Sequence, residues 1–153
     1  MKKKISIACH NLRSAFNTGS IFRTADAAGL EKVYLCGYTP FPPHDKLSKT
    51  SRNTEQSVSW EHVDDIMDLI RSMKKKGVSI AALEKDARAV DYKKADYKTP
   101  LLLIVGNEAL GLPEEILSEA DSVISVPMEG TVKSLNVAVA AGIVIYEAVG
   151  SGT

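Results

Sequence analysis

The chain has 153 residues, of which 44% are apolar and 25% are charged, and its 19 basic residues balance its 19 acidic ones. This composition excludes a disordered or fibrous protein and fits a single compact domain. The balanced charge does not by itself predict a nucleic-acid or membrane partner.

Five short apolar runs, each followed by a polar or glycine-containing turn, are typical of parallel strands buried on both faces of a sheet. They are Ile5–Cys9, Val33–Cys36, Ser79–Leu83, Leu101–Val105 and Ser122–Val126. Helical patterns lie between most of them, over about 19–28, 63–76, 113–119 and 134–149. Strands that alternate with helices predict an α/β fold with a mostly parallel sheet flanked by helices.

Two segments do not fit this alternation. Residues 38–57 contain three prolines and have no convincing periodicity, so we interpret them as a long functional or mobile loop. Residues 86–98 are polar and ambiguous, and the pattern predicts nothing for them.

The expected last helix is apolar nearly all round, whereas a helix on the outside of a monomer keeps a polar face. Either the domain covers this helix on both sides or a second subunit covers its outer side. The chain has too few other helices to cover it completely, so we favour a homodimer. Its longest uncharged apolar run, Val137–Tyr146, is about half of what spans a bilayer.

The two cysteines, Cys9 and Cys36, each end an expected strand and lack CxxC spacing. We interpret them as small buried hydrophobic residues of a protein in a reducing compartment. The first lysines are followed by too few apolar residues for a signal peptide, so we expect a cytoplasmic protein without a membrane segment. The three histidines do not group with acidic or cysteine residues, and no metal site is predicted.

Ligands of open α/β sheets bind beyond the carboxyl ends of the strands, and three such loops contain notable residues. The first loop reads "HNLRSAFNTGSIFRTA". Asn17, Thr18 and Gly19 form a plausible helix cap and turn, and Arg23 follows in the helix. Taken alone, Asn17 is interpreted as a cap and Arg23 as a surface cation.

The second loop reads "GNEALGLP". Gly106 and Gly111 have the spacing of a phosphate loop, but Leu112 and Pro113 occupy the positions of the required Lys and Ser or Thr, which excludes a nucleoside triphosphate site. The glycines instead allow a ligand to approach the backbone closely. Glu108 is available to orient a neighbouring group.

The third loop reads "PMEGTVKSLN". Ser134 is suitably placed to cap the last helix, whereas Asn136 is expected inside the first helical turn among apolar residues. An amide there needs hydrogen-bond partners, which makes Asn136 a candidate site residue. The sequence lacks the glycine, serine and histidine motifs of dehydrogenases and hydrolases.

The segments "NTGSIFRTA", "IVGNEALGL" and "VPMEGTVKSLNVAVA", in this order, resemble the SPOUT superfamily of S-adenosylmethionine-dependent RNA methyltransferases. Within this superfamily they resemble the SpoU or TrmH branch, whose members methylate ribose 2′-hydroxyls. The resemblance implies a C-terminal deep trefoil knot, an exception to the rule that chains do not thread loops. It also implies a homodimer with the active site at the interface. We expect one such domain over residues 1–153, with no appended RNA-binding domain, acting on tRNA or rRNA.

The resemblance also implies roles for individual residues. The catalytic set is Asn17, Arg23, Glu108, Ser134 and Asn136. The set expected to bind S-adenosylmethionine is Leu103, Val105, Gly106, Asn107, Gly111, Val126, Pro127, Met128, Ser134 and Leu135. The RNA-binding set is Arg13, Arg23, Lys46, Lys49 and Arg52.

Proposals for the family make the arginine a general base, but a guanidinium normally stays charged. We therefore expect Arg23 to bind the phosphate beside the target ribose and to stabilise the forming alkoxide. Where close relatives resemble "KTALGAE", this chain has "KTSRNTE" at 49–55, which changes the expected substrate contacts of that loop. The alternatives are a non-catalytic RNA- or cofactor-binding homologue and a methyltransferase acting on a base atom.

Overall fold

The computed structural model describes residues 3–151, and within this range seven parallel strands form one sheet in the order β3-β2-β1-β6-β4-β7-β5. The strands are β1 (Ile5–His10), β2 (Lys32–Cys36), β3 (Trp60–Val63), β4 (Ser79–Leu83), β5 (Val90–Asp91), β6 (Leu101–Val105) and β7 (Ser122–Ser125). The expected parallel α/β fold is confirmed. The threading of the C-terminal segment stays a prediction, and residues 1–2 and 152–153 of the expected domain lie outside the described residues.

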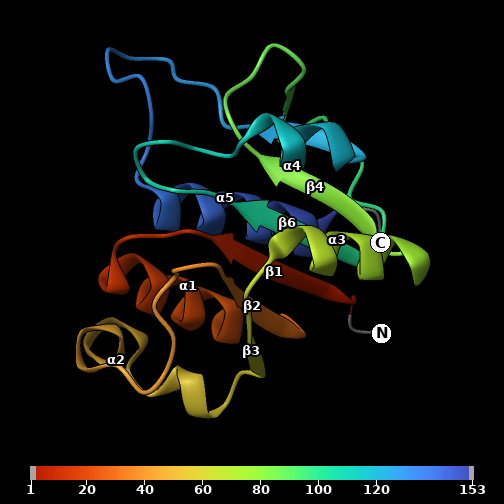
Figure 1. Ribbon diagram of the computed structural model, residues 1–153. Helices are drawn as coiled ribbons and strands as arrows, with labels where there is room; N and C mark the ends of the chain where they lie inside the picture. The colour runs from red at the N-terminus through yellow and green to blue at the C-terminus, as the bar shows by residue number, and fades with distance from the viewer. Residues whose placement is uncertain (1–2, 152–153) are drawn as a thin grey trace.

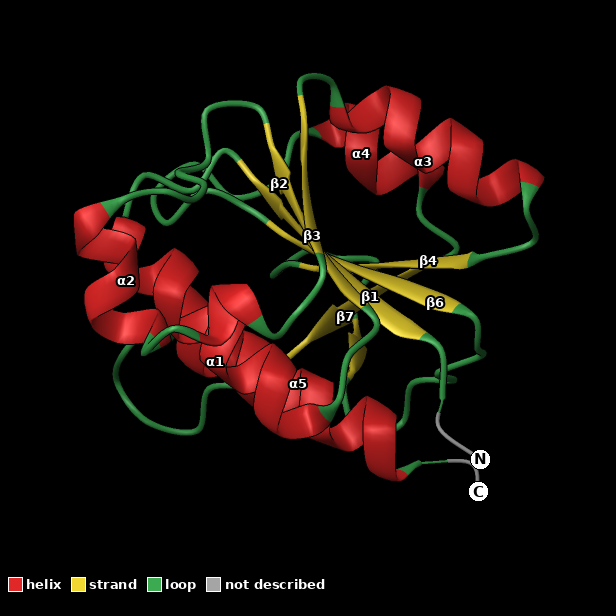
Figure 2. Ribbon diagram, turned by 90° about the horizontal axis from the view of Figure 1, so that it is seen from below, coloured by secondary structure: helices red, strands yellow, loops and turns green. Residues whose placement is uncertain are grey.

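Helices cover both faces of the sheet. They are α1 (Ala15–Ala28), α2 (Asp45–Ser51), α3 (Ile66–Lys75), α4 (Glu114–Glu119) and α5 (Val137–Gly150), with a short 3-10 helix, η1 (Thr54–Gln56). Helices α1, α2 and α5 lie on one face, and α3 and α4 lie on the other (Figures 1 and 2). Alternate strand residues face opposite layers: Ile7 and Leu103 pack toward α1 and α5, and Ile104 packs toward α3 and α4. Burial on both faces explains why the central strands are continuously apolar.

Helix α1 begins four residues earlier than the sequence predicts. Its N-cap is Ser14, whose hydroxyl accepts a hydrogen bond from the Asn17 backbone N–H at 3.1 Å. The interpretation of Asn17 as a cap and of Gly19 as a turn residue is therefore wrong. Gly19 lies inside the helix, where an added Cβ would stand 2.3 Å from the carbonyl oxygen of Leu47. This glycine allows α1 and α2 to cross at close range.

The segment expected to be one long loop contains α2 and η1, so that interpretation was wrong for residues 45–51 and 54–56. Helix α2 has seven residues, too few for a helical period to be visible, and Leu47 is its one fully buried apolar side chain. Strands β3 and β5 were also missed. β3 has the half-exposed sequence WEHV, and β5 has two residues.

Two other helix starts differ from expectation. Helix α3 begins at Ile66 because the Asp65 side chain accepts a hydrogen bond from the Met67 N–H, and Val63 ends β3 instead of starting the helix. Helix α5 begins at Val137, and its N-cap is Asn136 rather than Ser134. Both results reflect side-chain capping, which decides where a helix begins.

The rest of the chain covers one side of helix α5 and leaves the other side exposed. Ala141, Val144 and Ile145 are buried against the sheet, whereas the side chains of Val139 and Tyr146 are 52% and 54% exposed. No helix among residues 3–151 is long and apolar enough to cross a membrane. Cys9 and Cys36 are fully buried free thiols, as expected, and burial raises the pKa of Cys36 to about 12.

Candidate active site at the carboxyl edge of the sheet

The three loops singled out in the sequence meet around the Glu108 carboxylate. Its Oε1 accepts a hydrogen bond from the Arg13 backbone N–H at 2.9 Å, and its Oε2 accepts from the Ser14 N–H at 2.9 Å and from the Asn17 side-chain amide at 3.0 Å. The Asn136 amide donates in turn to the Asn17 side-chain oxygen at 3.0 Å. These contacts, called the Glu108 network below, join the loops after β1, β6 and β7.

Each member of this network has one definite hydrogen-bonding role. The Asn136 oxygen accepts from the Ala138 and Val139 N–H groups and so caps α5, while its amide holds Asn17. Burial acts to raise the pKa of Glu108, but the hydrogen bonds from Arg13, Asn17 and Ser14 outweigh it and lower that pKa below its ordinary value. Glu108 is therefore ionised at neutral pH and acts as an acceptor.

A cavity of about 420 Å³, called the strand-edge cavity below, lies beyond the carboxyl ends of β4, β6 and β7. Eight of the ten residues expected to bind cofactor line it: Gly106, Asn107, Gly111, Val126, Pro127, Met128, Ser134 and Leu135. Glu108 also lines it. The Glu108 network therefore borders a space large enough for a small molecule.

The other two residues of that set, Leu103 and Val105, do not line the cavity. Both belong to β6 and are 2% and 1% exposed within the hydrophobic core beside α1 and α5. Their side chains follow the alternation of the strand into the core, so neither contributes a side chain to the cavity, and their place in the cofactor site stays a prediction.

Several lining residues were not identified from the sequence. They are Leu83, Glu84, Lys85, Ser125, Val137 and Ala140, whereas Ala109 and Lys133 also line the cavity and lie within the expected cofactor loops, residues 103–111 and 126–136. Leu83 ends β4 and Glu84 and Lys85 follow it, and β4 lies between β6 and β7 in the sheet. The rule that ligands bind beyond strand ends could have identified them, but only once the strand order was known.

Glycines permit the close backbone approach at the floor of this cavity. An added Cβ on Gly106 would stand 2.8 Å from the carbonyl carbon and oxygen of Gly111. Gly111 itself has a φ of 67° and lies over the Glu84 carboxylate, which an added Cβ would meet at 2.2 Å. Close contacts within the chain therefore require glycine at both positions, in addition to the predicted approach of a ligand to the backbone.

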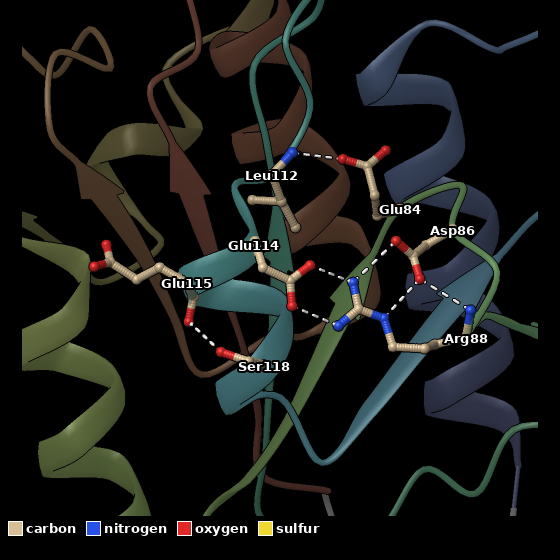
Figure 3. A network of polar contacts seen from close by, with 7 residues as sticks. All are labelled: Glu84, Asp86, Arg88, Leu112, Glu114, Glu115 and Ser118. Carbon is tan, nitrogen blue, oxygen red and sulfur yellow. Dashed lines mark hydrogen bonds and ion pairs between the residues drawn. The ribbon is translucent and has the colours of Figure 1, made fainter.

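An ion-pair cluster joins the two segments that flank the cavity (Figure 3). The Arg88 guanidinium contacts Asp86 at 2.7 Å and 3.0 Å and Glu114 at 2.7 Å and 2.8 Å. The guanidinium of Arg88 lowers the pKa of Asp86 to about 2. A second tie lies nearby, because the Leu112 N–H donates to the Glu84 carboxylate. These contacts hold the segment after β4 against the start of α4.

Arg23 lies apart from the strand-edge cavity of the same chain. It lines a second cavity of about 550 Å³, called the basic cavity below, together with Lys49, Thr50, Arg52 and Tyr146. Three of the five residues expected to bind RNA thus come together between α1, α2 and α5. The other two, Arg13 and Lys46, are exposed and line neither cavity. Among residues 3–151, no three His, Cys, Asp or Glu side chains gather as metal ligands.

Comparison with known proteins identifies relatives over almost the whole chain. The model of the SpoU rRNA Methylase family matches residues 4–146. The tRNA (guanosine(18)-2′-O)-methyltransferase of Aquifex aeolicus is 34% identical over 151 residues, covering 96% of this chain and 69% of the relative.

Solved structures agree with this result. The AdoMet-bound rRNA methyltransferase from Sinorhizobium meliloti superposes with a TM-score of 0.90 at 34% identity, over 97% of this chain and 56% of that one. A structure described in terms of the 2-OH methylation of C/U34 on tRNA gives a TM-score of 0.84 at 27% identity, over 95% and 94% of the two chains. The chain thus spans little more than half of the first solved relative and nearly all of the second.

Proposed function

The chain belongs to the SpoU rRNA methylase family, and on that premise we propose that it transfers a methyl group from S-adenosylmethionine to a ribose 2′-hydroxyl of tRNA or rRNA. The observation that carries this proposal is the Glu108 network, in which residues from three distant loops meet beside one cavity. The relatives act on different RNAs and nucleotides, so the proposal specifies the ribose hydroxyl and leaves the nucleotide open.

We assign S-adenosylmethionine to the strand-edge cavity. Its volume of about 420 Å³ falls within the range of small-molecule sites, and Leu83, Val126 and Leu135 provide apolar walls. The lining contains the carboxylates of Glu84 and Glu108 and the ammonium groups of Lys85 and Lys133, which suits a ligand that carries charges of both signs. When bound, the cofactor supplies a methyl group on a positively charged sulfur atom, already activated for displacement.

The protein then has to align the ribose and support loss of its hydroxyl proton. Asn17, Glu108 and Asn136 fix the three loops relative to one another, which favours one geometry of approach. Ser134 lines the cavity beside them and offers a hydroxyl to the substrate.

Arg23 has the chemistry of a phosphate-binding residue. Its guanidinium offers several N–H donors in a planar fork, and it shares the basic cavity with Lys49 and Arg52. A bidentate contact to the phosphate beside the target ribose would hold the RNA and stabilise negative charge on the 2′-oxygen. Arg13 and Lys46 would add outlying phosphate contacts, which makes RNA binding salt-dependent.

We further propose a homodimer in which α1 and α5 contact a second copy. The exposed apolar side chains of Val139 and Tyr146 lie on α5, and Phe16 on α1 is 47% exposed. Tyr146 also lines the basic cavity, so a partner seated there would border Arg23. The two buried free thiols fit a reducing compartment, and we place the enzyme in the cytoplasm.

The decisive experiment is transfer of labelled methyl from S-adenosylmethionine to total tRNA and rRNA, followed by nucleoside analysis. We expect a 2′-O-methylated nucleoside with wild type and none with Arg23→Ala. Arg23→Lys tests the need for the bidentate contact, which near-wild-type turnover would rule out. No label in any RNA would favour a non-catalytic homologue, and a methylated base would favour the base-modifying alternative.

A further inference from the structure

Residues 38–44, called the aromatic loop below, follow β2 and have no role in the function proposed above. They line a third cavity of about 420 Å³ that is separate from both cavities already described. The side chains of Tyr38 and Phe41 are 58% and 43% exposed. Aromatic rings that stay in water do not give the fold the stabilisation that buried rings give. Two exposed rings on one short loop therefore suggest an interaction site.

The start of this loop is held firmly in place. The buried Thr39 hydroxyl lies 3.0 Å from the Cys9 carbonyl oxygen and 2.8 Å from that of Cys36, and it accepts a hydrogen bond from the Leu12 N–H at 3.0 Å. The Asn11 side-chain oxygen accepts from the Tyr38 N–H at 3.1 Å. The aromatic loop and the loop after β1 are therefore fixed relative to each other.

Tyr38 is also connected to the candidate active site. Its hydroxyl accepts a hydrogen bond from the Asn107 side-chain amide at 3.0 Å, and the same amide donates to the Asn11 carbonyl oxygen at 2.9 Å. Asn107 precedes Glu108 in the loop after β6. The Tyr38 ring thus has a definite position next to the Glu108 network, although most of its side chain is open to solvent.

The Phe41 ring packs against two other aromatic rings. Its ring stacks on His62 with centroids 4.3 Å apart, and the Trp60 ring lies 6.4 Å away. This arrangement limits the movement of the Phe41 side chain while part of its surface stays exposed. A ring that is already ordered loses little side-chain entropy when it binds a flat partner.

The chemistry of the surroundings favours a nucleobase as that partner. Sequence-specific proteins bind unpaired RNA bases by stacking them on aromatic side chains while cations contact the phosphates. His44 lines the same cavity, Lys46 is exposed two residues later, and Arg13 is exposed beside the Leu12 amide that contacts Thr39. Resting on the proposed RNA methylation, we propose that Tyr38 and Phe41 stack unpaired bases of the RNA substrate near the nucleotide that is methylated.

The first test uses single-stranded poly(U) and the poly(A)·poly(U) duplex as probes. Trp60 is the only tryptophan of the chain and lies beside Phe41, so its fluorescence reports on binding at this loop. We expect Tyr38→Ala and Phe41→Ala each to weaken poly(U) binding by about tenfold and to leave duplex binding unchanged. Tyr38→Phe keeps the ring but loses the bond from Asn107, so it should bind poly(U) more tightly than Tyr38→Ala.

Three further measurements separate this inference from folding and from the proposed function. Phe41→Ala should keep the S-adenosylmethionine affinity of wild type, and each variant is assayed well below its own unfolding midpoint. In methyl transfer, the alanine variants should raise KM for RNA with little change in kcat. Wild-type poly(U) affinity in both alanine variants would overturn the proposal, and so would equal losses for single-stranded and duplex RNA. Absence of methyl transfer in wild type would refute the proposed function. The poly(U) measurements would then test only whether the aromatic loop binds unpaired bases.

Discussion

The side-chain amide of Asn136 donates to the side-chain oxygen of Asn17 at 3.0 Å, across 119 positions of sequence. Because Asn136 also caps α5, this contact fixes the start of α5 against the first turn of α1. Asn17→Ala removes this bond and the one to Glu108, and a typical hydrogen bond contributes about 1 kcal/mol. We expect a loss of about 1–2 kcal/mol in the free energy of unfolding.

Misalignment of the loops in Asn17→Ala should affect catalysis more than stability. We expect kcat for methyl transfer to fall between about tenfold and a hundredfold. Labelled methyl transfer, assayed at a temperature well below the unfolding midpoint of the variant, measures this effect. An unchanged kcat would show that the network is structural only.

The pH dependence of stability should contain a contribution from Glu108. Its pKa is lowered in the folded state, so its stabilising effect is present above the unfolded glutamate pKa of about 4.3 and is lost as pH falls through the folded pKa. We expect Glu108→Gln to be less stable than wild type at neutral pH, with a difference that shrinks in acid. Urea unfolding between neutral pH and about pH 3 measures it.

Glu115→Gln is the matched control for this experiment, because Glu115 is exposed and only its backbone carbonyl accepts a hydrogen bond, from Ser118. Its stability should follow that of wild type at every pH. A constant difference between Glu108→Gln and wild type across the whole range would contradict the assigned cause.

The glycine at position 106 should not tolerate a methyl group. In Gly106→Ala the new Cβ would press on the Gly111 backbone, which has little freedom to move, and overpacking of this kind typically costs about 1–3 kcal/mol. We expect that loss in denaturant unfolding, with weaker S-adenosylmethionine binding by calorimetry. Gly150→Ala has no heavy atom within 4 Å of its new Cβ and lies in α5, so it should be at least as stable as wild type. Equal behaviour of the two variants would refute the close contact.

The ion pairs of Arg88 should affect ligand binding more than stability. Arg88→Gln removes contacts to Asp86 and Glu114 that hold the segment after β4 against the start of α4. Ion pairs this exposed contribute little to folding, so the unfolding midpoint should barely change. We expect a weaker S-adenosylmethionine affinity by calorimetry. An unchanged affinity would show that the Glu84 contact to Leu112 is sufficient.

The proposed dimer predicts a change of molecular mass. Tyr146→Glu places a charge among exposed apolar residues of α5 and should shift the protein to monomers in sedimentation equilibrium. Val90→Glu alters an exposed valine on β5, at the other end of the sheet from β3, and should leave the mass of wild type. A wild-type protein that sediments as a monomer would refute the interface.

The sequence predicts the central strands well because apolar runs buried on both faces leave a clear pattern. It does not predict β3 or α2, since WEHV is half-exposed and α2 is too short to show a period. The resemblance places Asn17, Glu108 and Asn136 in the site, but the hydrogen bonds between them depend on strand order. The same dependence hides Glu84 and Lys85, which reach the cavity only because β4 lies between β6 and β7.

Gly19 allows α1 and α2 to come into close contact where they cross, and the Thr50 hydroxyl joins them by donating to the Phe16 carbonyl oxygen at 2.9 Å. Arg23, Lys49 and Arg52 therefore project from two backbone segments that are fixed relative to each other, as one unit. In the proposed complex, such a unit would select RNA whose sugar–phosphate chain already has a matching curvature. Any other RNA would have to deform to reach it, so the polynucleotide rather than the protein would make the conformational adjustment.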